Sequence, residues 1–557
     1  IHNVMNRIST LITVLVLSAS AAQAQWVPDD KAYTVVGKDS IYGQSGLKTL
    51  RTDDGKIVLT WLNHPTDVSY KDPNYGYHLY MQTFDKDGHS LLGKEGKVIV
   101  GRSTRSWYTD YSLEMAPDGN ILISYSDTRY DPDKQNVGNY LYCYTTEGEP
   151  VWSEDGIVAA AVFPTLYGHT FSSLCPLVCV SGKNIYGTIV ANDDYKVKAD
   201  STNWQPSPWF PDEEMPDSID VHDANFQVMR YNADGTYAWA NTKTINTGSA
   251  WAYSGPDGGL YIVYVNGGYG LSAILIDQDG NDVWKEPVCV VKETIGTSSY
   301  TTPPTVVPDD NGGLMLTYRV LKNYGGYIAC NHITRDGKVY EESLLANGTT
   351  DGDSNLPAIA VNGERAFVAF NYKDETSTSN LWINQLDIDG DYTWEGDSLL
   401  GYSLDNNESW GLKPVKIIPQ SDGWVLLYGN LQSWNGANFY ISKIDFEGKE
   451  LWRKQIAESD FKSSGFSVVN DDKYVYIFYT CDMEIGDDWE QIPGEGGMRV
   501  MCVDISNVET GINSLNSNPT KTSRAIYNAQ GVLVDNMNDA GLYIVRENGT
   551  TRKIMKK

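Results

Sequence analysis

The sequence predicts an all-β protein, an eight-bladed β-propeller of four-stranded antiparallel blades, with seven blades as the alternative count. Three observations predict this fold. A turn of the form Asp-x-x-Gly followed by Trp recurs along the chain, a second Gly-containing turn precedes each copy, and the two ends of the repeated region complement each other. At 557 residues the chain is too long for one ordinary compact domain, whereas a repeat fold grows by adding units.

The first recurring phrase is a β-rich run, a turn that ends in glycine, and a tryptophan a few residues later. The five complete copies are Gly148 with Trp152, Gly235 with Trp239, Gly280 with Trp284, Gly390 with Trp394, and Gly448 with Trp452. Degenerate copies end at Gly88 and Gly337, and the last copy, 500–504, has neither Gly nor Trp. Five tryptophans in one register predict a structural residue that docks each blade on the next.

The second phrase is a glycine turn followed by a run of β-forming residues. Examples are Gly55 before 57–61, Gly119 before 121–125, Gly258 before 260–264, and Gly313 before 314–318. Asp-Gly and Asn-Gly turns between such runs are the strongest short-range signal of a hairpin. Each unit therefore holds two tight hairpins, A–B and C–D, and four short antiparallel strands make one propeller blade.

The ends of the repeated region predict how the ring closes. The eighth unit has candidate strands at 466–469, 474–479 and 499–503 but no fourth strand. Near the N-terminus, the run 32–37 has no hairpin partner and is similar to the strand-D segment 97–101. We therefore expect the N-terminal strand to complete the last blade, which removes the open edges of an unclosed sheet.

The repeated phrase Ile-Asp-x-x-Gly-x-x-x-Trp resembles the tryptophan-docked repeat of quinoprotein (pyrroloquinoline quinone) propellers and their cofactor-free relatives. The resemblance covers residues 25–506 at the level of the repeat pattern. It implies a propeller fold, but its members range from dehydrogenases to assembly scaffolds, so it does not imply one activity. The sequence has no adjacent cysteine pair of the kind such dehydrogenases use against the quinone, and we assign no cofactor.

Residues 1–24 are expected to form a secretory signal peptide, with 1–4 as a possible upstream extension before Met5. Arg7 supplies the positive charge, 8–21 is a short apolar run, and Ala22-Gln23-Ala24 fits a cleavage site. No later segment is long and apolar enough to cross a bilayer, so no membrane span is expected after cleavage.

The chain has seven cysteines. Cys143, Cys330 and Cys502 fall at comparable points of the repeat where apolar residues otherwise stand, so we expect small buried hydrophobic residues. Cys175 and Cys179 lie four residues apart on one extended run, a separation of about 13 Å that is too long for a disulfide between them.

The last fifty residues differ in composition from the rest. A polar linker, 507–523, leads to a small basic module, 524–557. Its Tyr527-Asn528, Gly531, 541–545 and Lys-rich end resemble the C-terminal sorting domain of the Bacteroidota type IX secretion system. This resemblance implies a secreted or outer-surface protein of a Gram-negative bacterium that engages the secretion machinery. The alternative is a small structural β-domain.

Net charge and motifs narrow the function. A formal charge of −29 argues against nucleic-acid binding, which needs a positive surface. The acidity is explained by solubility, by calcium sites or by a cationic partner. With seven histidines, no HExxH and no Gly-x-Ser-x-Gly motif, the sequence assigns no catalytic residue, no metal ligand and no cofactor, although calcium stays possible without assigned ligands.

The long B–C and D–A loops open on one face of a propeller, and this long-loop face is where functional residues are expected. Its largest feature is the insertion 191–224, which carries aromatic and acidic residues. The candidate ligand-binding residues are Trp107, Tyr108, Asp127, Arg129, Asp193, Asp194, Trp204, Trp209, Trp251, Trp410 and Trp434. Aromatic rings beside carboxylates suit sugars. The insertion could equally be a surface loop held by its own aromatics, the single tryptophans could pack the rim, and Asp127 could form a local ion pair with Arg129.

Three functions fit these patterns. The leading one is a secreted or cell-surface propeller that binds glycan or protein through the long-loop face without catalysis. The second is a polysaccharide-active enzyme, a hydrolase or lyase, with carboxylates at the mouth of the channel. The third is a structural assembly scaffold, for which an exposed apolar patch would be expected.

Overall fold

The computed structural model of the chain describes residues 26, 29–36, 45–63, 77–104, 111–127, 136–164, 177–199, 214–239, 242–267, 270–293, 295–297, 300–301, 304–322, 325–349, 357–373, 379–394, 402–404, 413–430, 438–457, 466–481, 497–506, 525–527, 533–534, 541–547 and 550–556. In several strands, among them 29–34, 191–197, 219–224 and all of 525–556, it describes the backbone alone.

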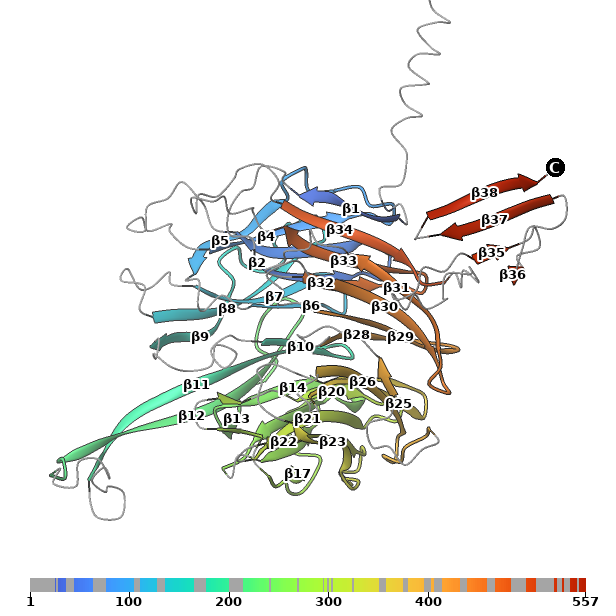
Figure 1. The fold of residues 1–557 in the computed structure, drawn as a ribbon. Helices are drawn as coiled ribbons and strands as arrows, with labels where there is room; N and C mark the ends of the chain where they lie inside the picture. Colours follow the sequence, from blue (N-terminus) through green and yellow to red (C-terminus); the bar gives the residue numbers. More distant parts are fainter. Residues whose placement is uncertain are drawn as a thin grey trace, which may run out of the picture. The chain divides into compact units, whose positions relative to one another are not determined.

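Between residues 29 and 504 the described chain forms eight four-stranded antiparallel sheets (Figure 1). Seven of them take four consecutive strands each, in the order A–B–C–D, and the eighth combines both ends of this region. The protein is therefore an eight-bladed β-propeller, as predicted, and the alternative count of seven is wrong.

Blades 1 to 4 follow one another from residue 45. Blade 1 comprises β2 (Ser45–Arg51), β3 (Ile57–Asn63), β4 (Tyr77–Phe84) and β5 (Lys97–Thr104). Blade 2 comprises β6 (Tyr111–Met115), β7 (Ile121–Asp127), β8 (Asn136–Tyr144) and β9 (Ile157–Pro164). Blade 3 comprises β10 (Leu177–Ser181), β11 (Asn184–Lys198), β12 (Ser218–Tyr231) and β13 (Lys243–Asn246). Blade 4 comprises β14 (Ala250–Ser254), β15 (Leu260–Val265), β16 (Leu271–Ile276) and β17 (Val288–Val291), with the 3₁₀ turn η3 (Pro256–Gly258) between its first two strands.

Blades 5 to 8 complete the ring, after a two-stranded ribbon of β18 (Gly296–Thr297) and β19 (Tyr300–Thr301). Blade 5 comprises β20 (Thr305–Pro308), β21 (Leu314–Lys322), β22 (Gly325–Ile333) and β23 (Ser343–Thr349). Blade 6 comprises β24 (Ala358–Asn362), β25 (Arg365–Lys373), β26 (Ser379–Asp387) and β27 (Tyr402–Leu404). Blade 7 comprises β28 (Lys413–Gln420), β29 (Gly423–Asn430), β30 (Asn438–Asp445) and β31 (Glu450–Ala457). Blade 8 comprises β32 (Phe466–Asn470), β33 (Tyr474–Cys481), β34 (Gly497–Asp504) and β1 (Asp29–Val36).

The ring closes through its N-terminal strand. β1 pairs antiparallel with β34, so that Tyr33 lies opposite Val500, and it supplies the outer strand of blade 8. The predicted closure by the N-terminus is confirmed. This arrangement removes the free edge that strand β34 would otherwise present.

The hydrophobic core lies between the blades. The buried apolar side chains fall into eight clusters, and each cluster combines residues from two adjacent blades. One of them joins blade 8 to blade 1, where Phe478 and Val500 pack with Leu59 and Phe84. Every blade is thus buried on both faces, which explains why strand B of most blades reads as a continuous apolar run.

Three docking tryptophans, Trp152, Trp239 and Trp284, pack on the turn glycine of the following blade, and these three and Trp394 hydrogen-bond to that turn. The indole N–H donates to a carbonyl of the next C–D turn: Trp152 to Ala233 at 2.8 Å, Trp239 to Gln278 at 2.9 Å, Trp284 to Arg335 at 3.0 Å and Trp394 to Phe446 at 2.9 Å. A Cβ at Gly235 would lie 3.0 Å from the Trp152 ring, and Gly235 has φ +83°. The turn therefore needs glycine both for its backbone and for the neighbour's indole.

A sixth tryptophan does the same at the ring closure. Trp26 precedes β1, its indole N–H donates to the Asp85 carbonyl at 3.2 Å, and its ring lies where a Cβ at Gly88 would be. The repeat pattern does not reveal Trp26, because no turn glycine precedes it in the sequence.

Trp452 is the exception among the docking residues. Blade 8 has no C–D turn, since its strand D comes from the other end of the chain. Within the part of the chain that the structure describes, the buried indole N–H of Trp452 has no hydrogen-bond acceptor.

This difference gives a first testable prediction. Trp152→Phe should lower the free energy of unfolding by about 1 kcal/mol more than Trp452→Phe, because only the first change removes a hydrogen bond and leaves a carbonyl without its donor. Urea unfolding followed by circular dichroism measures both. Equal losses in the two variants would contradict a role for the indole N–H in docking.

Three cysteines lie inside the inter-blade cores, as predicted. Cys143, Cys330 and Cys502 are buried and carry free thiols. Burial raises the pKa of each thiol to about 12, so these residues stay protonated and behave as small apolar side chains.

The insertion in blade 3 differs from the surface loop considered above. β11 is 15 residues long and β12 is 14, whereas no other described propeller strand exceeds nine. β10 pairs with β11 only up to Thr188, and β13 pairs with β12 only from Asn225. Beyond these points β11 and β12 continue as a two-stranded ribbon that projects from the blade (Figure 1). We call residues 189–198 and 218–224 the arm.

The C-terminal residues form a compact unit of their own, 508–557, distinct from the unit 1–507. It contains β35 (Ala525–Tyr527), β36 (Leu533–Val534), β37 (Gly541–Glu547) and β38 (Thr550–Lys556) in one sheet of order β36-β35-β37-β38. The signal peptide and linker predictions, 1–24 and 507–523, lie outside the described residues. Among the residues that are described, no helix has the length and apolar character that a bilayer span requires.

Candidate functional site

Seven of the eleven candidate ligand-binding residues on the long-loop face lie outside the described residues. These are Trp107, Tyr108, Arg129, Trp204, Trp209, Trp410 and Trp434. The structure describes the other four, Asp127, Asp193, Asp194 and Trp251, and places them on three consecutive blades, 2, 3 and 4.

Asp127 and Trp251 lie at strand ends next to the long loops. Asp127 is the last residue of β7 and is fully buried, opposite Gly138 in the backbone ladder. Trp251 lies on the first strand of blade 4 and is partly buried against the core between blades 4 and 5. Much of the Trp251 ring is therefore used in packing, and a ligand could contact at most one edge of the ring.

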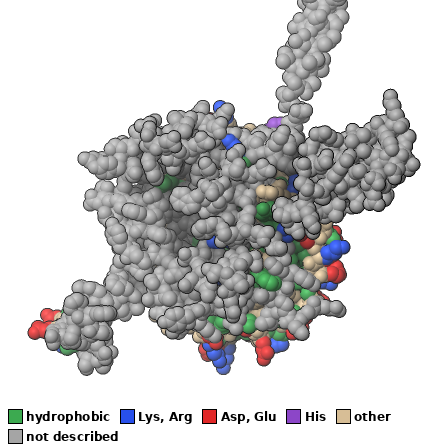
Figure 2. All heavy atoms as spheres, in the orientation of Figure 1, with side chains coloured by type: hydrophobic (Ala, Val, Ile, Leu, Met, Phe, Trp, Pro, Cys, Tyr) green, Lys and Arg blue, Asp and Glu red, His purple; other side chains and the backbone are tan. Residues whose placement is uncertain are grey.

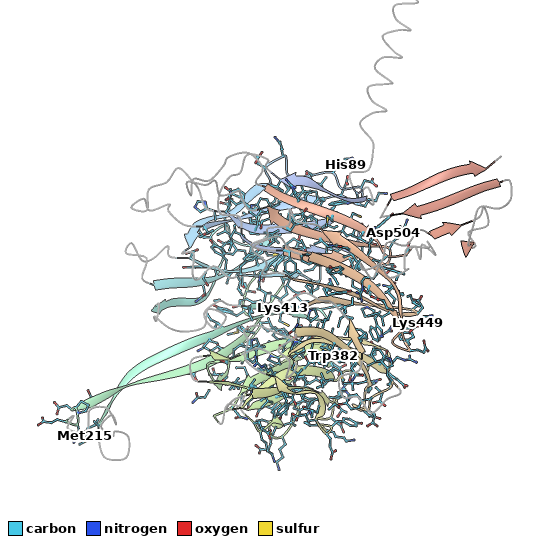
Figure 3. The ribbon with its side chains drawn as sticks, viewed as in Figure 1. His89, Met215, Trp382, Lys413, Lys449 and Asp504 are labelled. Atoms are coloured by element: carbon cyan, nitrogen blue, oxygen red, sulfur yellow. The ribbon has the colours of Figure 1, made fainter. Side chains whose placement is uncertain are left out.

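Asp193 and Asp194 lie on the arm. In the backbone register they stand opposite Asp223 and His222, well beyond the four-stranded part of blade 3. Residues 214–217, which lead into β12, are exposed, and Met215 keeps 49% of its surface accessible. Figure 3 places Met215 at the far end of the arm, and Figure 2 shows acidic side chains there. Residues 214–217 thus present acidic and apolar groups at the far end of the arm, away from the blades.

A second feature lies among the tight turns, where the sequence did not point. A hollow of about 420 Å³ opens between the turns of blade 5 and the C–D turn of blade 6. Its lining residues are Asp309, Asn311, His332, Thr334, Arg335, Asp336, Tyr340, Ile388 and Asp389.

A buried histidine–aspartate pair forms one wall of this hollow. His332, near the end of β22, places Nε2 2.6 Å from Oδ2 of Asp309, and both side chains are at most 3% exposed. Asp309 also accepts the backbone N–H groups of Asn311 and Gly313, each at 2.7 Å. The ring of Tyr340 stacks on His332 with centroids 5.2 Å apart. The carboxylate and the ring together fix the imidazole in one orientation.

A histidine oriented by a buried carboxylate is also the arrangement of a general base. That function needs the other ring nitrogen to reach a substrate. Nδ1 of His332 is itself buried and has no partner among the described groups, so a molecule in the hollow does not reach it without a side-chain rotation.

Blade 7 has a comparable link, because Lys443 on β30 forms an ion pair with Asp422 of its A–B turn. We therefore interpret the pair in blade 5 as a clamp between the A–B turn and strand C.

Weak signals for the clamp exist in the sequence. His332 is one of only seven histidines. The turn Asp309-Asp310-Asn311-Gly312-Gly313 has two aspartates and two glycines. A Cβ at Gly313 would lie 2.5 Å from Oδ2 of Asp309, so the second glycine makes room for the pair. The contact between Asp309 and His332 itself cannot be read from either signal.

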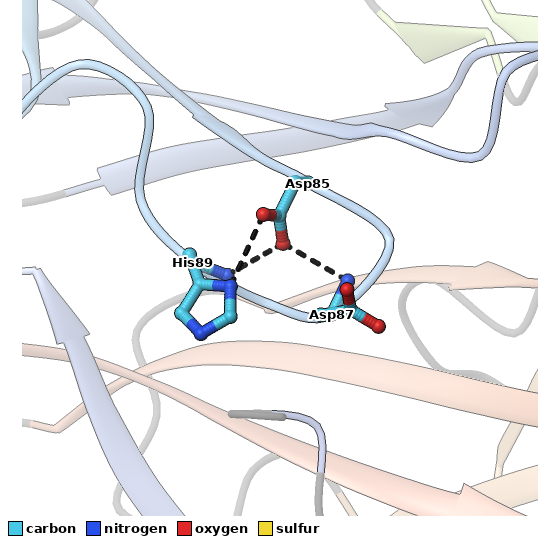
Figure 4. Close-up of side chains that lie close together, drawn as sticks. All are labelled: Asp85, Asp87 and His89. Atoms are coloured by element: carbon cyan, nitrogen blue, oxygen red, sulfur yellow. Dashed lines mark hydrogen bonds and ion pairs between the residues drawn. The ribbon is translucent and has the colours of Figure 1, made fainter. Parts of the chain in front are cut away.

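One turn brings together three groups of the kinds that bind metals. Asp85, Asp87 and His89 lie in the C–D turn of blade 1 (Figure 4), with one potential ligand atom of each within 4.8 Å of the others. Asp85 accepts the backbone N–H groups of Asp87 and His89 and contacts the ring of His89 at 3.1 Å. Partial burial acts to raise the pKa of Asp85, but these hydrogen bonds together hold it below its usual value.

The same turn recurs elsewhere without a histidine. Asp277 accepts the backbone N–H groups of Asp279 and Asn281, and Asp387 accepts those of Asp389 and Asp391. The cluster at Asp85 is therefore explained as the turn of the repeat, whose first aspartate caps the backbone.

Comparison with known proteins gives no family. No family model matches the chain, and no curated protein matches it. Among solved structures, a puromycin hydrolase is similar at 14% identity over 73% of this chain and 52% of its own, with a TM-score of 0.35. The chain thus spans about half the length of that hydrolase.

Two further solved structures cover more of their own length. The NanB sialidase of Streptococcus pneumoniae is similar at 10% identity over 86% of this chain and 72% of its own, with a TM-score of 0.35. The β-propeller domain of the Trilobed protease from Pyrococcus furiosus is similar at 11% identity over 72% of this chain and 99% of its own, with a TM-score of 0.32. At these identities and TM-scores the likenesses carry no argument about activity.

Proposed function

We propose that this protein is a non-catalytic binding propeller that engages a glycan or protein ligand through its long-loop face. The arm of blade 3 carries this proposal. A two-stranded ribbon without a third strand is at best marginally stable in water, because it has no core of its own. The four-stranded pairing of blade 3 ends at Thr188 and Asn225 and does not need this extension, so a binding role accounts for it best.

The position of the arm supports the same function. It is the B–C connection of its blade, and it leaves the propeller where the long connections do. Loops on a rigid scaffold are where binding residues concentrate. The candidates Asp193 and Asp194 lie on the arm, and the candidates Trp204 and Trp209 belong to the same insertion, 191–224, in the sequence.

An arm-deleted variant tests the proposal. Val190 and Phe226 are paired in the ladder, so replacing 191–225 with Asn-Gly joins them through a two-residue hairpin turn and keeps blade 3 intact. We expect the chain from residue 25 onward to bind ligands on a glycan array or in a protein-binding screen. The variant should lose that binding while its thermal unfolding is unchanged.

The enzyme alternative is tested in the same samples. Reducing-sugar release from polysaccharides, measured in parallel, should be absent. Release that disappears on changing Asp127 to Asn would overturn the proposal in favour of a hydrolase or lyase. Silence in every assay would favour a structural scaffold.

A further inference from the structure

The arm offers open strand edges to a partner. In an antiparallel ladder every second residue directs its N–H and C=O away from the paired strand. Along residues 189–197 of β11, and along residues 218–224 of β12, no described strand takes up these groups. Such an edge is a template on which an extended chain adds as a further strand.

The charge of the insertion restricts which chain can pair with the arm as a further strand. Residues 191–224 carry nine acidic residues and only two lysines, Lys196 and Lys198. The described end of the insertion bears this out, since Glu214 and Asp217 are exposed. Two such arms brought edge to edge would place like charges side by side, which is a recognised way of preventing pairing between copies.

An extended segment rich in lysine or arginine carries the opposite charge and is attracted to the arm. Its backbone satisfies the open edge, and its side chains complement the acidic ribbon, which raises the association rate and excludes acidic competitors. The insertion then selects its partner in two ways, by the charge of the partner's side chains and by the pairing of its backbone.

We propose that the arm binds a cationic protein segment by strand addition. This inference rests on the proposed binding function and names its partner class. The segment pairs through its backbone with the free edge of β11 or β12, and the net negative charge of the insertion attracts its lysines or arginines.

The test uses the chain from residue 25 onward and a labelled synthetic peptide that alternates lysine with valine. Fluorescence anisotropy measures its binding at low and at high salt. The matched control peptide has the same sequence with every second amide N-methylated, which keeps the charge but removes the strand hydrogen bonds. We expect the first peptide to bind, and the methylated peptide to bind about tenfold more weakly, equivalent to ~1.4 kcal/mol.

Protein variants separate charge on the arm from charge elsewhere. Asp193, Asp194, Asp220 and Asp223 changed together to Asn should weaken peptide binding about tenfold and reduce its salt dependence. The control changes four exposed acids on tight turns, Asp118, Asp234, Asp279 and Glu447, to the corresponding amides. It removes the same charge and should leave binding unchanged.

The outcomes distinguish this inference from the function on which it rests. Equal binding of the methylated and unmethylated peptides, or equal effects of the two sets of variants, would overturn strand addition at the arm. Loss of glycan binding in the arm-deleted variant, with no peptide binding, would overturn the cationic partner and leave the binding function standing. Unchanged binding of every ligand after deletion of the arm would overturn both.

Discussion

Replacing Trp26 with alanine lowers the free energy of unfolding by about 3–5 kcal/mol, the range for a buried large aromatic side chain. Trp26 is 7% exposed. Its ring meets Phe84, Tyr476 and Phe478 edge-on, with centroids 5.4, 5.2 and 6.1 Å away. The variant loses these contacts and the hydrogen bond to the Asp85 carbonyl, at the one blade interface whose two sides come from opposite ends of the propeller chain.

Chemical unfolding followed by circular dichroism measures this loss. Leu91→Ala is the matched control, because Leu91 lies just after the same turn of blade 1 but is 43% exposed. Its effect should stay within about 0.5 kcal/mol, as for other surface changes. A Trp26 variant as stable as the control would mean that the N-terminal tryptophan does not dock blade 8 on blade 1.

The second large effect is expected at the clamp of blade 5. Asp309→Ala should destabilise the protein by about 3–5 kcal/mol, because it leaves a buried histidine without its partner. It also leaves the N–H groups of Asn311 and Gly313 without the acceptor that holds the A–B turn. Glu149→Ala, in the ion pair with Lys97, should cost only about 0.2–1 kcal/mol, since both side chains are exposed, 68% for Glu149 and 39% for Lys97.

A double-mutant cycle shows whether the pair acts as a unit. His332→Phe keeps a ring to stack on Tyr340 and removes the polar partner of Asp309. The double variant should be more stable than the sum of the two single losses implies, because neither polar group is then left buried alone. Strict additivity of the two changes would show that Asp309 and His332 stabilise the blade independently.

The repeat made most of the fold predictable. Turn glycines at fixed spacing locate the hairpins, and the missing fourth strand of the last unit, set beside the partnerless run 32–37, predicts the closure. What the sequence leaves open is which groups meet across blades. The phrase Gly-x-x-x-Trp reads as one local motif, yet Trp152 packs on Gly235 of the following blade and not on Gly148 of its own. That pairing depends on how neighbouring blades stack.

The candidate site was less predictable, for a physical reason. Periodicity identifies strands, but for residues 191–224 a loop and a two-stranded ribbon fit the sequence equally well. The register of Asp193 with Asp223 shows which form is adopted. The clamp joins Asp309 to His332 across a whole hairpin. The position of single polar residues on strands does not predict such a contact. The cationic partner remains a proposal, to be decided by binding.

Closure by the N-terminal strand also sets the order in which the blades fold. Asp29 pairs with Cys502, so the first propeller strand to be synthesised waits for the last one. Bringing such distant segments together is entropically unfavourable and slow, so blade 8 forms after the others. Until then the edges of β1 and β34 are both open. At high local concentration the β1 of one molecule can complete blade 8 of another, which makes strand exchange between copies the characteristic misassembly of this ring.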